Sequence, residues 1–332
     1  MSTAAIHPHS APSLPQPVVP VEGVAACGRV PEVPAPGVVL DVATIGYLVL
    51  AEGFGGRVHS VFASACNLLG GDMLLTIAAW HVGDGPATLR LAGSATLDLR
   101  AVFDVGESVG SHGGVLRAGR VELSLRRVQV WRPVAPACPL PPERIDVRLQ
   151  AVAASLAQCD RGQSSILGSD GAATVAALRD ACRTLDVESA VRHATRLVGW
   201  GEGLTPAGDD FLIGLLAGLD AFVAGDDRRG RMRGAIAALV TLCARRTTPI
   251  AAHYLKLAAG GHYNEPLVGL RNALLAEDDR HAVDAALHRA LAIGASSGAD
   301  TARGLLAGLN VWLPPYTGAA VNAMPGSRDS CG

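Results

Sequence analysis

Short apolar segments with strand character follow one another along the first part of the chain, and in 97–102 and 121–126 apolar and polar residues alternate with the period of about two that a half-buried β-strand shows. The segments with strand character are 38–42, 57–62, 73–77, 97–102 and 121–126. Glycine pairs at 55–56 and 70–71 separate some of them, and such pairs are typical of tight turns between strands. Short strands at this spacing predict an antiparallel β domain over residues 37–135, built as a small sheet or a barrel.

The pattern changes after a cluster of prolines between residues 133 and 142, which marks a domain boundary. Beyond it the composition shifts to alanine, leucine and arginine, and apolar residues recur with the helical period of about 3.6. Helices are expected at 143–159, 171–185, 187–198, 206–224, 229–246, 247–259, 265–276, 280–293 and 298–308. The predicted fold class is therefore α+β, with an all-helical domain over residues 142–313.

Two flanking segments complete this organisation. Residues 1–36 are rich in proline and predict a disordered leader, and residues 314–332 predict a flexible tail. The leader lacks the basic region and the long apolar region of a signal peptide. The seven cysteines are scattered without any C-x-x-C spacing, which is typical of reduced thiols. We therefore expect a cytoplasmic protein.

The charge balance excludes some classes of partner. The chain has 332 residues, and its 28 Lys and Arg against 30 Asp and Glu leave a formal net charge of −2. Such a balance provides no general attraction to nucleic acid or to an anionic membrane. The longest apolar run, residues 211–225, is interrupted by Asp220 and is too short to span a bilayer.

Lysine is almost absent, because Lys256 is the only one in the chain. A P-loop requires a lysine at the end of its glycine-rich turn, and no glycine-rich segment here ends in one. Schiff-base chemistry would depend on Lys256 alone, and the residues around it have the pattern of an ordinary amphipathic helix. Any phosphate-like ligand is therefore expected to bind through backbone N–H groups and arginine.

The most informative segment runs from residue 199 to 212. Its alternating glycines allow the backbone to turn tightly and to approach a ligand closely. Thr205 is a suitable N-cap and Pro206 fits the first helical position, so a helix is expected to begin here with its N–H groups directed at a small anion. The residues predicted to contact the ligand in this segment are Gly201, Gly203, Leu204, Thr205 and Gly208.

Asp209 and Asp210 occupy the first turn of that predicted helix, and both are candidate catalytic residues. Acidic side chains at this position also complement the helix dipole, which is the structural alternative. Adjacent helical residues point about 100° apart, so the two carboxylates face different surroundings. One of them is predicted to orient a polar substrate, to bind a divalent cation or to act as a base; the pattern does not choose between the two.

Two further segments are candidates for the same site. In residues 294–304 a glycine and small hydroxyls again lead into a helix, with Ser296, Ser297, Gly298 and Asp300 as predicted contacts. Ser297 as N-cap with Asp300 three residues later resembles a capping box, which needs no ligand.

In residues 245–250, Arg245 and Arg246 offer guanidinium groups for a carboxylate or phosphate, and Thr247 and Thr248 are predicted substrate contacts. The alternative is a helix end followed by a cap and a new helix. The histidines show no H-x-x-x-H spacing, so no metal site is assigned, although a divalent cation at the aspartates stays open. No serine lies in a G-x-S-x-G elbow.

From Gly199 to Gly214 the chain reads G-W-G-E-G-L-T-P-A-G-D-D-F-L-I-G. This block resembles the G-x-G-x-G-L-T-P-[SA]-G-D-D-x-L-x-G pattern of the bacterial AllH-type family. A threonine-rich helix start at 247–255 and a late glycine-serine block at 294–304 match in the same order, so the resemblance covers the chain beyond its leader. Ala207 and Ala295 depart from the pattern where serine and histidine are frequent, and a role of those side chains would not transfer.

The resemblance implies a subunit of oxamate carbamoyltransferase, an enzyme of allantoin and purine breakdown. That enzyme converts oxalurate and phosphate to oxamate and carbamoyl phosphate with partner subunits. On this hypothesis the glycine-rich loop holds phosphate, and Asp209 or Asp210 orients the carbamoyl nitrogen or a cation. The alternative hypothesis is a non-catalytic scaffold or a small-anion-binding subunit of a multi-subunit complex.

Overall fold

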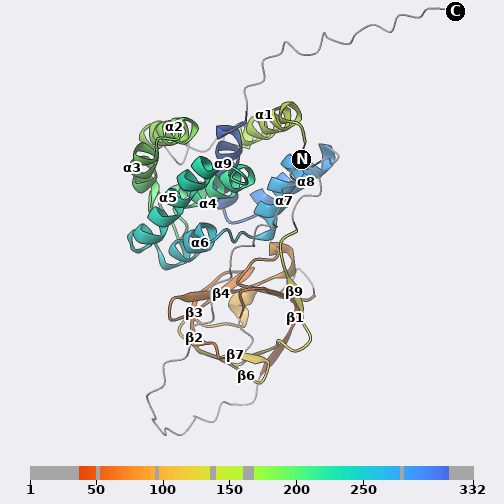
Figure 1. Cartoon of the computed structure of the whole chain (residues 1–332). Helices are drawn as coiled ribbons and strands as arrows, with labels where there is room; N and C mark the ends of the chain where they lie inside the picture. Colours follow the sequence, from red (N-terminus) through yellow and green to blue (C-terminus); the bar gives the residue numbers. More distant parts are fainter. Residues whose placement is uncertain are drawn as a thin grey trace, which may run out of the picture. The chain divides into compact units, whose positions relative to one another are not determined.

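The computed structural model describes residues 37–49, 53–93, 97–134, 140–159, 168–276 and 280–313 (Figure 1). The predicted leader at 1–36 and the predicted tail at 314–332 lie outside these residues. Among the helices within these ranges, none combines the length and the apolar character that crossing a membrane requires.

The N-terminal part is a β-barrel. Its strands are β1 (Val38–Gly46), β2 (Gly55–Val61), β3 (Ala65–Gly70), β4 (Met73–Ala78), β5 (Thr88–Leu91), β6 (Ser108–His112), β7 (Val115–Ala118), β8 (Val121–Ser124) and β9 (Gln129–Trp131). They pair in the order β5-β4-β3-β2-β6-β7-β8-β1, and an additional pairing of β5 with β1 closes the ring that is visible in Figure 1. Strand β9 pairs with the second half of β1, beyond the stretch that pairs with β8.

Apolar side chains that alternate with polar ones along the strands point inward and fill the barrel. In β7 and β8, for example, Leu116 and Leu123 are fully buried and face each other in register, while Arg117 and Glu122 pair on the outside. This is the inside–outside pattern that the period of two produces in a closed sheet. The buried side chains form one cluster that is separate from the core of the helical part.

Three details of the predicted β domain were wrong. The sheet is mixed and not purely antiparallel, because β1 runs parallel to β8 and β9, and β4 runs parallel to β5. Residues 97–102 form no strand, since the Asp98 side chain caps a short 3₁₀ turn at Leu99–Ala101 by accepting a hydrogen bond from the Arg100 N–H. The 55–56 glycine pair begins β2, whereas the 70–71 pair does form the predicted turn, with Gly71 at φ +58°.

The second part is helical, as predicted. Its helices are α1 (Pro142–Cys159), α2 (Gly168–Thr184), α3 (Val187–Leu197), α4 (Ala207–Leu219), α5 (Asp227–Cys243), α6 (Pro249–Ala259), α7 (Glu265–Leu275), α8 (Arg280–Leu291) and α9 (Ser297–Val311). Several begin at a side-chain cap, such as Asp186 before α3, Thr248 before α6 and Asn264 before α7. The ends of α4 and α5 continue as short 3₁₀ turns, which accounts for the longer helices expected there.

Helices α4 and α9 lie in the middle of this part, with backbone against backbone. A Cβ atom at Gly214 of α4 would overlap the carbonyl oxygen of Thr301, and one at Gly304 of α9 would overlap that of Phe211. Gly218 and Gly308 make equally close approaches one turn further on. Residue numbers rise together along the contact, so the two helices are parallel and their N-termini lie at the same end.

We predict that Gly304→Ala destabilises the protein, because the added methyl group has no space and the backbones must separate. Overpacking of this kind costs about 1–3 kcal/mol or more in free energy of unfolding, which denaturant titration measures. Gly234 is the matched control, since it is exposed in the middle of α5 with nothing near its missing side chain. Gly234→Ala should raise stability by up to about 1 kcal/mol. Equal effects at the two positions would contradict the close packing.

Candidate functional site

The loop between α3 and α4 has the backbone that its glycines predict. Gly199, Gly201 and Gly203 all adopt positive φ, at +75°, +106° and +94°. Residues 201–204 are exposed, and the backbone N–H groups of residues 201–205 donate to no acceptor in the described part of the chain. An exposed run of free N–H groups ahead of a helix N-terminus is suited to a small anion.

The beginnings of α4 and α9 differ from the predicted caps. Pro206, and not Thr205, is the N-cap of α4, and it makes no side-chain capping bond. Ser296 precedes α9 and Ser297 is its first residue, so the predicted capping box is absent. The physical reason is that the hydroxyls of Thr205 and Ser297 bond to each other across the two helices, at 2.7 Å, instead of bonding to their own helix ends.

Asp209 is fully buried and both of its carboxylate oxygens are occupied. Its Oδ1 accepts a hydrogen bond of 2.9 Å from the N–H of Gly199, and its Oδ2 accepts one from the hydroxyl of Thr247. Burial raises the pKa of Asp209, and the bonds from Thr247 and Gly199 act in the opposite direction. This carboxylate therefore joins the glycine loop, the start of α4 and the segment before α6.

Asp210 has a different environment. Its side chain is 5% exposed, and its Oδ2 is buried without a hydrogen-bond partner among the described residues. Burial raises the pKa of Asp210 to about 8; the hydroxyls of Ser297 and Thr205 lower it, and the charges of Asp300 and Asp209 add to the rise. A carboxyl with this pKa is mostly protonated at neutral pH, so it is a hydrogen-bond donor there.

The third carboxylate is Asp300 in the first turn of α9, which is 1% exposed. Its Oδ1 forms an ion pair of 2.8 Å with Arg303, one turn along the same helix. Gly298, between Ser297 and Asp300, lies so close to the Ala290 carbonyl that only glycine fits. The Thr205–Ser297 bond and the close approach of α4 to α9 place the late glycine-serine block directly against the first block.

The 245–250 segment forms a helix end, a cap and a new helix, which was the structural alternative. Thr248 caps α6 by accepting from the N–H of Ala251 at 3.1 Å, and its hydroxyl also donates to the carbonyl of Leu204 in the glycine loop. Arg245 and Arg246 are exposed, and the Arg246 guanidinium donates to the Thr195 carbonyl. The threonines therefore lie at the loop, whereas the arginine side chain with a described bond points elsewhere.

One group near the carboxylates was missed from the sequence. The hydroxyl of Tyr254 on α6 lies 3.2 Å from that of Thr76 on β4, which donates to Asn67 on β3 at 2.9 Å. Burial raises the pKa of Tyr254, the bond to Thr76 acts against this, and the charge of Asp210 adds to it. The available signal was the presence of Asn67 and Thr76 within otherwise apolar strand segments, because buried polar side chains need partners.

The site thus gathers the residues from three separate segments of the sequence. These segments contain loop N–H groups without a described acceptor, the bonded hydroxyls of Thr205 and Ser297, and the Asp210 carboxyl with its raised pKa. Uncommitted N–H groups and a protonated carboxyl are donors of the kind that bind small anions. The described residues include no group of three or more His, Cys, Asp or Glu placed to hold a metal ion. A divalent cation at the aspartates stays a prediction.

Comparison with known families matches the two parts of the chain separately. The family model described as oxamate carbamoyltransferase subunit AllH matches residues 197–309, which include the whole of the site. The model described as the AllH family N-terminal domain matches residues 40–130, the barrel. No solved structure matches the chain.

The raised pKa of Asp210 predicts how stability depends on pH. A carboxyl whose pKa rises on folding binds more protons in the folded state, so stability falls as the pH rises from about 4 to about 8. The free energy of unfolding, measured by urea titration, should fall less between about pH 4 and about pH 8 in Asp210→Asn than in the parent. The difference between the two proteins is up to several kcal/mol, because each unit by which folding raises the pKa corresponds to about 1.4 kcal/mol.

His253 titrates in an overlapping range in the opposite direction, because burial lowers its pKa to about 4, and the comparison of variant with parent removes its contribution. Asp284→Asn, at an exposed position on α8, is the control and should leave the slope unchanged. Identical slopes for Asp210→Asn and the parent would show that Asp210 is ionised normally.

Proposed function

Since this chain belongs to the AllH family, we propose that it works as a subunit of an oxamate carbamoyltransferase and binds the reacting anion where α4 and α9 begin. The reaction on this proposal transfers the carbamoyl group of oxalurate to phosphate and yields oxamate and carbamoyl phosphate. The environment of the Asp210 carboxyl is the observation that supports this proposed anion site. A buried carboxyl with an unoccupied oxygen, beside two hydroxyls and free N–H groups, is unusual unless a ligand completes it.

Protonation of Asp210 is what makes this site compatible with an anion. Three ionised carboxylates with one guanidinium would repel phosphate, whereas a carboxyl with a pKa of about 8 offers a proton instead of a charge at neutral pH. The N-termini of two parallel helices add a positive potential at the same point. The remaining positive charge for a dianionic phosphate would come from a partner subunit or from a divalent cation.

The two neighbouring aspartates have separate roles on this proposal. Asp209 is a positioning residue, because its contacts to Gly199 and Thr247 hold the loop in the shape that exposes its N–H groups. Asp210 is the chemical group, since unlike Asp209 it retains an oxygen without a hydrogen-bond partner among the described residues. Thr205 and Ser297 orient the Asp210 carboxyl, and Thr248 fixes Leu204 in the loop.

These groups suggest one path for the proton. An oxygen of hydrogen phosphate attacks the carbamoyl carbon of oxalurate, and the bond from that carbon to the amide nitrogen breaks. The departing oxamate nitrogen must gain a proton, and the phosphate must lose one. Asp210 donates the first and accepts the second, so the carboxyl is restored at the end of each turnover.

The alternative is that the chain is a scaffold whose carboxylates only stabilise helix ends. The observation in its favour is Asp209, whose hydrogen bonds are complete without any ligand. Titration calorimetry of the purified chain separates the two hypotheses, because a scaffold of this kind should bind neither phosphate nor oxamate.

We predict that Asp210→Asn lowers carbamoyl phosphate formation from oxalurate by about 100-fold or more in the complex assembled with its partner subunits. This is the usual loss on removing a general acid. Asn has nearly the same shape as a protonated Asp and retains donors, so the KM for phosphate should change much less than kcat. Asp284→Asn is the matched control at an exposed position on α8 and should be fully active. Full activity of Asp210→Asn in a correctly assembled complex would eliminate the proposed proton transfer.

A further inference from the structure

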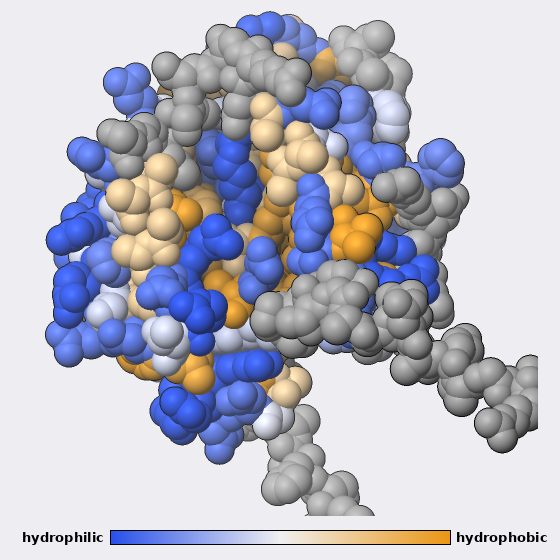
Figure 2. Space-filling view, turned by 90° about the horizontal axis from the view of Figure 1, so that it is seen from above, coloured by the Kyte–Doolittle hydropathy of each residue, from blue (hydrophilic) through white to orange (hydrophobic). Residues whose placement is uncertain are grey.

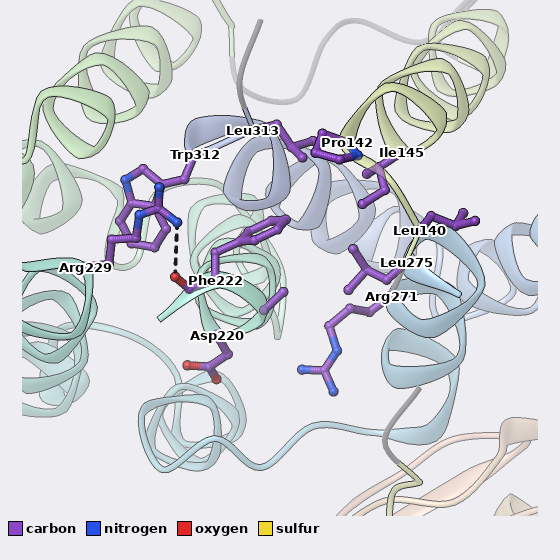
Figure 3. Close-up of a pocket in the computed structure, with 11 residues that line it drawn as sticks. Leu140, Pro142, Ile145, Asp220, Phe222, Arg229, Arg271, Leu275, Trp312 and Leu313 are labelled. Atoms are coloured by element: carbon purple, nitrogen blue, oxygen red, sulfur yellow. Dashed lines mark hydrogen bonds between the residues drawn. The ribbon is translucent and has the colours of Figure 1, made fainter. Parts of the chain in front are cut away.

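The helices that form the candidate site at their N-termini also border a cavity at their other ends (Figure 3). Asp220 and Phe222 directly follow α4, and Trp312 and Leu313 directly follow α9. With its 13 residues, α4 separates the two places by roughly 20 Å, at about 1.5 Å per residue. The cavity is therefore distinct from the site at Asp209 and Asp210.

The cavity has the size and the walls of a small-molecule site. Its volume is about 600 Å³, within the range of roughly 300–1,000 Å³ that is common for ligand pockets. Leucine, isoleucine and aromatic side chains from α1, α7 and the ends of α4 and α9 line it, and Figure 3 shows Phe222, Trp312 and Leu275 around the same space. The view in Figure 2 shows hydrophobic residues in a hollow on the face of the helical part, surrounded by hydrophilic ones.

The negative charge at the cavity is already neutralised. Asp220 forms a two-point ion pair with Arg233, at 2.6 and 3.1 Å, and accepts a hydrogen bond of 2.5 Å from the hydroxyl of Tyr263. Two further donors of Arg233 bind the backbone carbonyls of Ala258 and Ala259. The charge of Asp220 is therefore balanced within the protein.

Of the two arginines at the cavity, one is occupied and one is available. Arg229 pairs with Asp226 at 3.2 Å, stacks over the Trp312 ring at 5.3 Å and donates to the Phe222 carbonyl, the bond drawn in Figure 3. Arg271 is half-buried; it lies over the Tyr263 ring at 5.7 Å and has no carboxylate partner among the described residues. The described groups around the cavity therefore leave one positive charge unbalanced, beside an apolar wall.

We propose that this cavity is a second ligand site, which takes a small carboxylate with an apolar body. The carboxylate would pair with the planar guanidinium of Arg271, which presents parallel N–H donors that match two carboxylate oxygens. The apolar body would replace water against Phe222, Leu275 and Trp312, which lie just after α4, at the end of α7 and just after α9. This proposal is independent of the chemistry at Asp210.

The test is titration calorimetry of the full-length chain with 4-phenylbutyrate and with its uncharged amide. The acid should bind at least about tenfold more tightly than the amide, because only the acid forms the charged pair. Arg271→Gln should remove this difference by weakening the acid and leaving the amide nearly unchanged. Arg179→Gln, an exposed arginine on α2, is the matched control and should bind like the parent.

A second variant tests the apolar wall separately. Leu313→Ser should weaken the acid and the amide by a similar factor, and thermal unfolding checks that each variant is folded. The proposal is overturned if neither compound binds at millimolar concentrations, if both bind equally to the parent, or if Arg271→Gln binds the acid as the parent does. None of these outcomes depends on carbamoyl transfer, so they are distinguishable from a failure of the proposed function.

Discussion

The direct contact between the backbones of α4 and α9 is the constraint on which the site depends. Gly214 and Gly304 leave no room for side chains between the two helices, and the parallel arrangement places both N-termini together. Parallel helices bring like ends of their dipoles side by side, which is unfavourable unless negative groups lie there. Asp209 and Asp300 place negative charge in the first turns at this end, and the Asp210 carboxyl lies beside them. The same packing thus creates the positive potential of the two helix N-termini and brings together the carboxyl groups that offset it.

Environment, and not residue type, separates the two adjacent aspartates. Asp209 is held by a backbone N–H and a threonine hydroxyl, so its charge is compensated even though it is buried. Asp210 lies one residue further round the helix, next to Asp300 and two hydroxyls that also bond to each other. A rotation of about 100° along one helix is sufficient to give neighbouring carboxyls different protonation states. The sequence could identify the pair, but only the surroundings distinguish its members.

Local patterns predicted most of the fold, and contacts between distant segments account for what they missed. The helices follow from period and caps, and Thr248 before Pro249 is a reliable start. Closure of the barrel depends on the pairing of β1 with β5, which alternation cannot reveal, and 97–102 shows that alternation alone does not make a strand. Thr205 and Ser297 were misassigned as caps because each hydroxyl binds the other across 92 positions. The place of Tyr254 near the site depends on its bond to Thr76 on the barrel, which is a contact between distant segments that local pattern does not predict.

The close contact of α4 with α9 also governs when the site can come into existence. The two helices are separated by α5 to α8, so the contact spans about ninety positions and has a high loop-closure cost. A chain that emerges from the ribosome N-terminus first can complete its barrel early, but α4 has no partner until α9 has been synthesised. Until then the glycine face of α4 and its buried carboxylates are exposed to water. The site is therefore among the last features of the protein to form, and a chain that ends before α9 would lack it entirely.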